Sequence, residues 1–245
     1  SSQFNWTYDG LPPSISITAV NDNNEAIADD TTTNHAALTI VFTTSDATTN
    51  FVLEDITVSG GTLSNFSASS NSIYTATFTP SSSGSTTINV GADTFTDYAG
   101  NDNTAANSFD WTYDGTAPTI TISAEAAGVA INEGSTSNES TLTLTFVISE
   151  STTDFEVADI SVTGGELSDF SSSTLTSLSG TEYTALLKPS SSGPITIDIN
   201  SNQFTDPAGN GNISANRFNW VYDGITPTIS LLVSSGKDTI VNGMT

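Results

Sequence analysis

The sequence predicts an all-β fold made of tandem two-layer β-sandwiches, and three observations support this. Apolar residues recur at alternate positions, as in Leu38, Ile40 and Phe42, which is the period of a strand with one buried face. Threonine and β-branched residues are abundant in these runs, and Ser, Gly and Pro separate them, as is typical of strands joined by turns. Most of the pattern then occurs a second time.

The clearest repeated stretch is an aromatic ladder that ends in Asp-Gly and is soon followed by Pro. It reads FNWTYDG at 4–10, FDWTYDG at 109–115 and FNWVYDG at 218–224. Its rings occupy alternate positions, so they leave one face of an extended strand and favour a core strand over a sugar-stacking platform. The Asp-Gly that follows predicts a short turn-like connection.

The spacing of landmarks defines the repeat. Trp6 and Trp111 are 105 residues apart, and Trp111 and Trp220 are 109 apart. Between the two copies the offset of equivalent residues rises from 104 at Phe66 and Phe170 to 109 at Tyr74 and Tyr183. Five extra residues therefore fall between Phe170 and Tyr183 in a polar stretch, which predicts a surface loop. A period of this size is that of an independent domain. We therefore expect complete domains at 11–115 and 116–224, with the last strand of a preceding repeat at 1–10 and the first strand and loop of a following repeat at 225–245. On this interpretation the chain is a piece of a longer protein.

Each domain is expected to have seven strands and no helix. The third strand changes phase, since Phe155 and Val157 are odd-numbered whereas Ile160 and Val162 are even-numbered. Such a change predicts a β-bulge near Asp159, and another near the equivalent Asp55. A Gly-Gly pair then turns the chain into the fourth strand.

Composition excludes several classes of function. The chain has 27 acidic and 3 basic residues and a net charge of −24, so a nucleic-acid partner is excluded and an anionic membrane surface is disfavoured. It has no Cys and only one His, His35, so no nucleophile–base pair can be assembled, and we expect no enzyme activity and no role for His35. No apolar run is long enough to span a membrane, and no signal peptide opens the chain.

Several longer motifs carry a resemblance to a known family. They are PTITI at 118–122, DISVTGG at 159–165, PSSSG at 189–193 and TDPAGN at 205–210. Together they resemble the bacterial Ig-like tandem repeats of large extracellular adhesins and surface proteins. The resemblance implies tandem Ig-like seven-stranded Greek-key β-sandwiches, an extracellular or cell-surface location, and Ca²⁺ at the joints between repeats. The two copies differ at two positions: the first has Asn50 where the second has Asp154, and Tyr98 where the second has Pro207.

Acidic residues recur in the segments that such a sandwich gathers at the end where the chain enters. In the second domain the candidate ligands are Asp114, Glu150, Asp154, Asp159, Asp206 and Asn210. In the first domain they are Asp9, Asp46, Asn50, Asp55, Asp97 and Asn101, with Asp102 close behind. Converging carboxylates without Lys or Arg repel one another and favour a bound cation, and oxygen ligands without Cys or His clusters indicate Ca²⁺. Asp and Asn in such segments also form Asx-turns, so a purely turn-forming role remains open.

These observations favour a structural repeat segment of an extracellular stalk, adhesin shaft or filament, with interdomain joints rigidified by Ca²⁺. Its partners would be neighbouring Ig-like repeats of the same chain and, in a filament or lattice, lateral copies. The alternatives are a glycan- or protein-binding Ig-like module, for which the five-residue insertion is the one individual feature, and a subunit of a surface lattice. The loop 21–25 is expected to be solvated. Sequons occur at Asn5, Asn65, Asn138 and Asn212.

Overall fold

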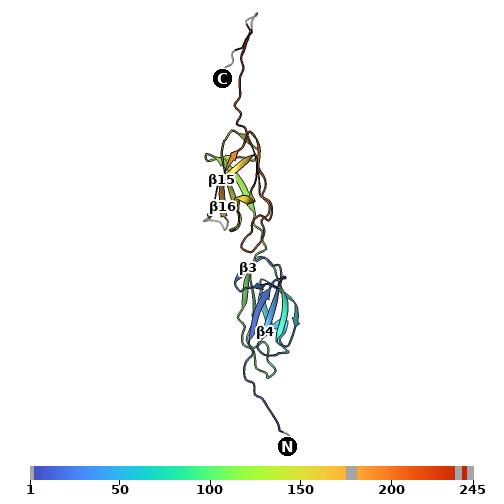
Figure 1. Ribbon diagram of the computed structural model, residues 1–245. Helices are drawn as coiled ribbons and strands as arrows, with labels where there is room; N and C mark the ends of the chain where they lie inside the picture. The colour runs from blue at the N-terminus through green and yellow to red at the C-terminus, as the bar shows by residue number, and fades with distance from the viewer. Residues whose placement is uncertain (1–2, 175–180, 235–238, 242–245) are drawn as a thin grey trace. The chain divides into compact units, whose positions relative to one another are not determined.

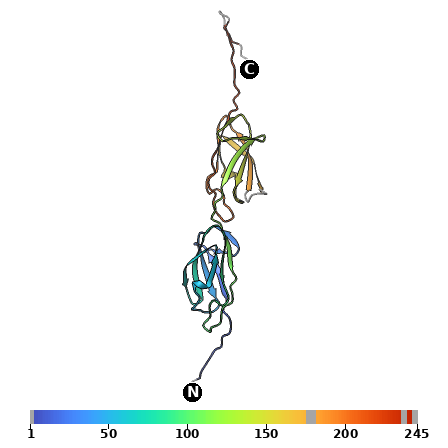
Figure 2. The same ribbon diagram turned by 180° about the vertical axis from the view of Figure 1, so that it is seen from behind.

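The computed structural model describes residues 3–174, 181–234 and 239–241, and the chain divides into two compact units. The first comprises Ser1–Pro118 with the loops Ser151–Asp154 and Phe204–Asn212, and the second comprises the rest. Both contain strands packed in two layers (Figures 1 and 2). The all-β prediction is therefore confirmed.

The first unit contains nine strands in two sheets. One sheet has the order β2-β1-β4-β7-β6 and the other has the order β3-β9-β8-β5. The strands are β1 (Ile15–Val20), β2 (Ala26–Ile27), β3 (Thr31–Thr33), β4 (Leu38–Thr44), β5 (Ile56–Ser59), β6 (Gly61–Ala68), β7 (Ile73–Pro80), β8 (Gly84–Val90) and β9 (Phe109–Tyr113).

The second unit repeats this topology, with sheets ordered β11-β10-β13-β16-β15 and β12-β18-β17-β14. Its strands are β10 (Ile120–Ala126), β11 (Val129–Ile131), β12 (Thr136–Ser137), β13 (Leu142–Ile148), β14 (Ser161–Thr163), β15 (Gly165–Thr174), β16 (Thr181–Pro189), β17 (Gly193–Asp198) and β18 (Phe218–Tyr222). A small hairpin of β19 (Leu232–Ser234) and β20 (Thr239–Val241) follows. The predicted insertion falls largely on 175–180, outside the described residues.

The core of each sandwich lies where the alternating residues of its two sheets meet. On β4 the side chains of Leu38, Ile40 and Phe42 are at most 1% exposed, whereas the alternate residues Thr39 and Thr43 are exposed and Val41 is half-buried. This alternation is the period-2 pattern read from the sequence, with its apolar face turned inward.

The aromatic ladder at 109–113 lies partly in this core. Phe109 and Trp111 are buried and Tyr113 is half-buried, and Trp111 packs edge-on against Phe78 with ring centroids 4.7 Å apart. Tyr113 instead lies over Gly115, where a Cβ would collide with the Tyr113 hydroxyl. The Tyr-Asp-Gly sequence thus needs its glycine because the ring fills the space that a side chain would take.

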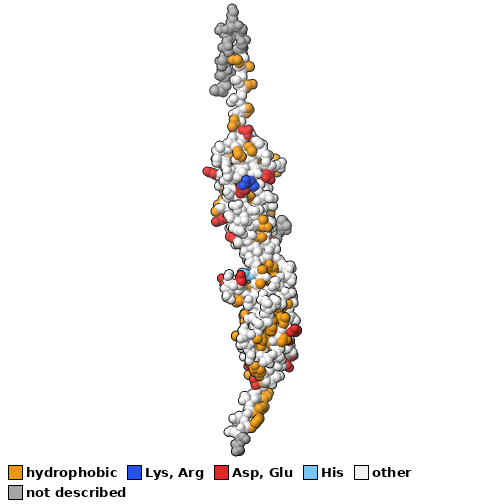
Figure 3. Space-filling model, turned by 90° about the vertical axis from the view of Figure 1, so that its right-hand side faces the viewer, with side chains coloured by type: hydrophobic (Ala, Val, Ile, Leu, Met, Phe, Trp, Pro, Cys, Tyr) orange, Lys and Arg blue, Asp and Glu red, His pale blue; other side chains and the backbone are white. Residues whose placement is uncertain are grey.

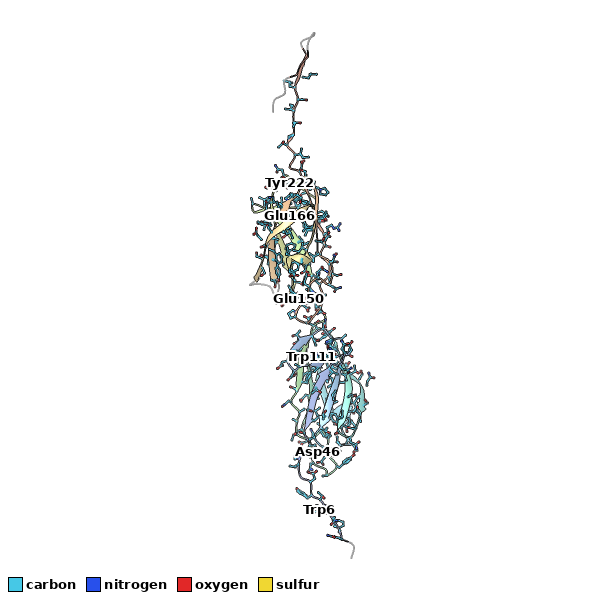
Figure 4. All side chains as sticks on the ribbon, viewed as in Figure 1. Trp6, Asp46, Trp111, Glu150, Glu166 and Tyr222 are labelled. Atoms are coloured by element: carbon cyan, nitrogen blue, oxygen red, sulfur yellow. The ribbon has the colours of Figure 1, made fainter. Side chains whose placement is uncertain are left out.

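The ladder at 4–8 lies in an extended N-terminal segment that contains no strand among residues 3–14. Its rings are largely exposed, with Trp6 at 74%, and Figure 4 shows Trp6 on this segment. The assignment of 1–10 to a preceding repeat, and the other predicted domain boundaries, stay predictions.

The phase change in the third strand has a different cause from the predicted bulge. One turn of 3₁₀-helix, Leu53–Asp55, precedes β5 in the first unit, and the turn Val157–Asp159 precedes β14 in the second. Each turn shifts the phase of the apolar residues. The register shifts lie instead in β6 between Ser64 and Ser67, and in β15 between Ser168 and Ser171. The expectation of no helix and of bulges near Asp55 and Asp159 was therefore wrong, because an apolar phase change does not distinguish a bulge from a single helical turn.

The predicted Gly-Gly turn is present in both units. Gly60 and Gly164 have φ of 75° and 82°, and a Cβ on either would lie 2.5 or 2.6 Å from a backbone oxygen of Ser85 or Pro194. Only glycine fits a left-handed conformation this close to a neighbouring strand.

Candidate metal centre

The TDxAGN loops form turns organised by their aspartate. Asp97 accepts hydrogen bonds from the backbone N–H of Ala99 and Asn101 at 2.8 and 2.9 Å, and from Asn101 Nδ2 at 2.8 Å. The Asn101 side-chain hydrogen bond is the largest influence lowering the pKa of Asp97. In the second repeat Asp206 accepts bonds from Asn210 N and Nδ2 at 2.8 and 2.9 Å. The turn-forming role that the sequence left open is thus present at both aspartates.

The same asparagines also hold the Asp-Gly connection. Asn210 Nδ2 donates to the Asp114 carbonyl at 2.9 Å, and Asn101 Nδ2 donates to the Asp9 carbonyl at 3.3 Å. One amide group therefore ties the loop aspartate and the connecting segment together.

Asp114 forms a turn of its own while it takes part in this arrangement. Its Oδ1 accepts the N–H of Thr116 at 3.0 Å and the Ser83 hydroxyl at 3.4 Å. Ser83 Oγ also accepts the N–H of Gly115 at 3.1 Å, and Ser192 Oγ accepts that of Gly224 at 2.9 Å. Neither serine was assigned a role from the sequence, although the PSSSG motif that contains each of them occurs in both repeats and could have identified them.

Three of the predicted ligands converge in the structure. Carboxylate oxygens of Asp114, Glu150 and Asp206 all lie within 4.8 Å of one another, with Asp206 buried and the other two half-buried. Glu150 directly precedes the 151–154 loop, where it follows β13 (Figure 4). We call these three residues the carboxylate cluster.

The carboxylate cluster brings three acidic side chains together. Two carboxylates about 5 Å apart repel by roughly 3 kcal/mol at an effective dielectric constant near 20. Three hard oxygen donors without Cys or His suit Ca²⁺, which takes 6–8 oxygen ligands and would need carbonyl groups or water as well. The donor set fits such an ion.

Other predicted ligands of the second repeat serve the loops instead. Asp154 accepts bonds from Thr152 Oγ1 at 2.6 Å and from Thr205 N and Oγ1 at 3.0 and 2.8 Å. Burial would raise the pKa of Asp154, but these hydrogen bonds outweigh it and lower the pKa. Asp159 accepts the N–H of Glu156 at 2.8 Å and closes the 3₁₀ turn. Neither belongs to the carboxylate cluster.

The predicted set of the first repeat does not converge in the same way. Among described residues, no group of three acidic side chains forms from Asp9, Asp46 and Asp97. Asp46 is one methylene shorter than Glu150, and its Oδ2 accepts the Ser45 hydroxyl at 2.7 Å.

The remaining first-repeat residues are held by local bonds. Asn50 Oδ1 accepts the Thr48 hydroxyl and the N–H of Thr96, and Asn50 Nδ2 donates to Thr96 Oγ1. These partners are the equivalents of Thr152 and Thr205, which bind Asp154. Asp55 closes its 3₁₀ turn by accepting the N–H of Val52.

One expectation about the polar residues near these loops needs correction. Asn21, expected in a solvated loop, is 3% exposed; its Oδ1 caps the turn, and its Nδ2 lies 3.3 Å from Nε2 of the half-buried His35. Asn212 is 1% exposed, so its sequon is inaccessible in the folded chain, whereas Asn5, Asn65 and Asn138 are exposed.

The amino-acid sequence matches a known protein family. The sequence profile described as a bacterial Ig-like domain matches residues 9–113 and 114–222, so all three residues of the carboxylate cluster lie within the second match. A search of the curated proteins found no match. No helix among the described residues is long and apolar enough to cross a membrane.

The chain is also similar to solved structures. One is InvD of Yersinia pseudotuberculosis, at 15% identity and a TM-score of 0.36, over 90% of this chain and 62% of that one. Another is the C-terminal domain of the antigen I/II-family protein AspA of Streptococcus pyogenes, at 10% identity and a TM-score of 0.36, over 86% and 99%. The chain spans less than two thirds of the InvD structure. At such identities and scores the similarity says nothing about function.

Proposed function

Since the chain belongs to the bacterial Ig-like domain family, we propose that it is a structural repeat segment of an extracellular stalk, adhesin shaft or filament. The observation that carries the proposal is the direct succession of two family matches, the second beginning at residue 114 where the first ends at 113. Small β-sandwich units joined without a long linker are typical of a spacer. On the same family membership we also propose a surface location and no catalytic role.

We further propose that the carboxylate cluster binds one Ca²⁺ ion. The three carboxylates supply the charge, and the Asn210 and Ser83 hydrogen bonds hold Asp114 in place for the ion. Asp114 belongs to the connection between the matched repeats, so an ion bound to it and to Glu150 and Asp206 would restrict that connection. This supports a mechanical role in which Ca²⁺ rigidifies the chain.

The binding step is tested by calorimetric titration of the chain with Ca²⁺. We expect one site, and we expect the double variant Asp114→Ala with Asp206→Ala to lose both binding and the Ca²⁺-dependent rise in melting temperature. Glu166→Gln removes one exposed charge elsewhere on the chain and should leave both intact. Equal loss in this control, or no binding by the wild type, would overturn the proposed site.

The mechanical step needs a separate measurement. Small-angle X-ray scattering of the chain in Ca²⁺ and in a chelator should show a change in maximum dimension when the ion is removed. Circular dichroism should show that the β content is unchanged, because the cores are made of apolar side chains. Ca²⁺ binding without any change in scattering would overturn the rigidifying role and leave the ion site standing.

A further inference from the structure

The outward face of the β2-β1-β4-β7-β6 sheet is lined by hydroxyl and small apolar side chains. On its central strands the outward residues include Thr39, Val41 and Thr43 of β4, paired with Thr77, Thr75 and Ile73 of β7. On the flanking strands they include Ser16 and Thr18 of β1 and Ser64 and Ser67 of β6. We call this surface the hydroxyl face.

The hydroxyl face carries no charged residue on any of its five strands. The chain as a whole has 27 acidic residues and a net charge of −24, so a sheet face without one is a distinctive feature. The other sheet of the same unit carries Asp110 outward on β9, with Asp29 and Asp30 hydrogen-bonded to its backbone. On the side viewed in Figure 3, white and orange atoms cover most of the surface and red carboxylates are scattered.

The equivalent face of the second unit is charged. In the second unit Glu125 pairs with Thr143, at the place where Val20 pairs with Thr39 in the first unit. Likewise Glu182 pairs with Val147 where Ile73 pairs with Thr43 in the first unit. Glu166 and Lys188 form a further pair on β15 and β16. Charge is therefore compatible with this position in the fold, and its absence is a property of the first unit.

Several hydroxyls of this face already have partners within the sheet. Ser67 Oγ lies 3.2 Å from Thr75 Oγ1, and the hydroxyls of Ser16 and Ser64 donate to the carbonyls of Thr43 and Thr77 at 3.3 and 3.5 Å. A surface laid on this face would therefore not leave these hydroxyls without a hydrogen bond, which lowers the cost of dehydrating them.

We propose that the hydroxyl face is a self-association surface, on which a second copy of this chain packs through its own hydroxyl face. Two chains of charge −24 repel, and the repulsion is strongest between carboxylates closer than the Debye length of about 8 Å. Sheet faces pack about 10 Å apart, so contact through this face places no carboxylates of the two sheets directly against each other. A two-fold arrangement of identical patches is the commonest form of such contact.

The size of the face sets the strength of the contact. Four strands about 4.8 Å apart and about seven residues long cover roughly 450 Å² per copy, about 900 Å² in total. This is just below the roughly 1,000 Å² that a stable specific interface needs. The dimer is therefore weak, with a Kd on the order of 0.1–1 mM. The contact is lateral and independent of the proposed Ca²⁺ site.

The test is sedimentation of the full chain from micromolar to millimolar concentration, in a chelator so that ion binding plays no part. Val20→Glu with Ile73→Glu copies the charges that the second unit carries at the same positions, so the fold accepts them. The control pair Thr57→Glu with Ser59→Glu adds the same charge to outward positions of β5 on the opposite face. We expect the first pair to weaken dimerisation at least tenfold and the control pair to change it less than twofold.

Two further results complete the test. Glu125→Val with Glu182→Ile removes two acidic charges from the second unit's face, where Glu166 and Lys188 remain, and should strengthen self-association. Raising salt should not weaken the dimer, because no ion pairs hold it. A wild-type chain that stays monomeric at about 1 mM would overturn the proposal. The same holds if the monomeric chain binds a neutral polysaccharide instead. Equal weakening by both glutamate pairs would also overturn it, because the effect would then reflect net charge alone.

Discussion

The two repeats share one topology but differ at the end where their loops gather acidic residues. In the second repeat Asp114, Glu150 and Asp206 converge, whereas the first repeat forms no such group from Asp9, Asp46 and Asp97. The hydrogen bonds from the asparagine to the aspartate of the TDxAGN turn occur in both. The comparison teaches that the fold supplies the turn, and that a few side chains decide whether carboxylates meet.

A second difference lies in the cores. Trp220 Nε1 donates to Ser137 Oγ at 3.1 Å, whereas Trp111 Nε1 is buried without a hydrogen-bond partner. Thr33 is the equivalent of Ser137, because Thr33 pairs with Tyr113 as Ser137 pairs with Tyr222. The Oγ1 of Thr33 accepts the N–H of His35 at 3.4 Å. We therefore expect the equivalent tryptophans to stabilise their sandwiches to different degrees.

The largest expected effect comes from removing either tryptophan. Trp111→Ala and Trp220→Ala should each lower the free energy of unfolding of their own unit by about 3–5 kcal/mol, because each leaves a cavity in a close-packed core. Denaturant unfolding followed by far-UV circular dichroism checks this, because the remaining core tryptophan lies in the other unit. Destabilisation below about 1 kcal/mol would show that the ladder is not a core strand.

Shortening Glu150 tests why only one cluster forms. Glu150→Asp gives the second repeat the side-chain length of Asp46, and we expect Ca²⁺ affinity to fall at least tenfold, or about 1.4 kcal/mol. Asp46→Asn is the matched control at the equivalent position and should leave the affinity unchanged. Calorimetric titration measures both, and unchanged binding in Glu150→Asp would remove Glu150 from the ligand set.

Trp→Phe substitutions compare the two indole nitrogens. Trp220→Phe removes a hydrogen bond and should cost about 1 kcal/mol more than Trp111→Phe, which removes a buried polar group that has no partner. Both lose similar apolar volume, so the difference isolates the nitrogen. Equal costs would indicate that Trp111 Nε1 has a partner such as water.

The smallest effect is expected at the position occupied by Asn50 in one repeat and Asp154 in the other. The pKa of Asp154 is lowered in the folded chain, so its contribution to stability is present above the unfolded value of about 3.9 and is lost as pH falls through the folded value. Asp154→Asn should change stability at pH 7 by less than about 1 kcal/mol, since the group is exposed. It should also flatten the decline in stability of the second repeat as pH falls below about 4.

Melting curves of the chain at several pH values test this prediction. Asn50 does not titrate, so Asp154→Asn gives the second repeat the group that the first repeat carries at this position. An acid transition of the second repeat that is unchanged by Asp154→Asn would assign its pH dependence to other groups of that repeat. Asp97 and Asp110, whose pKa values are also lowered by hydrogen bonds, lie in the first repeat and give it an acid transition of its own.

The sequence by itself determined the fold class, the repeat and much of the core of each unit. Alternation of apolar residues identified the buried face of β4 and β13, and the ladder placed Phe109, Trp111 and Trp220 inside. Pairs such as Gly60-Gly61 marked the turn into β6. These features are local, because strand period and turn conformation depend on residues a few positions apart.

Only the tertiary structure decided which acidic side chains meet and which serve their own loops. Residue type and spacing gave Asp114, Asp154 and Asp159 equal standing as ligands, yet one joins the carboxylate cluster, one binds Thr152 and Thr205, and one closes a 3₁₀ turn. Whether a carboxylate is engaged by a nearby N–H or hydroxyl depends on loop geometry that brings distant segments within 3 Å. The uncharged face of the β2-β1-β4-β7-β6 sheet was hidden for the same reason, because its residues come from five strands whose register exists only in the folded chain.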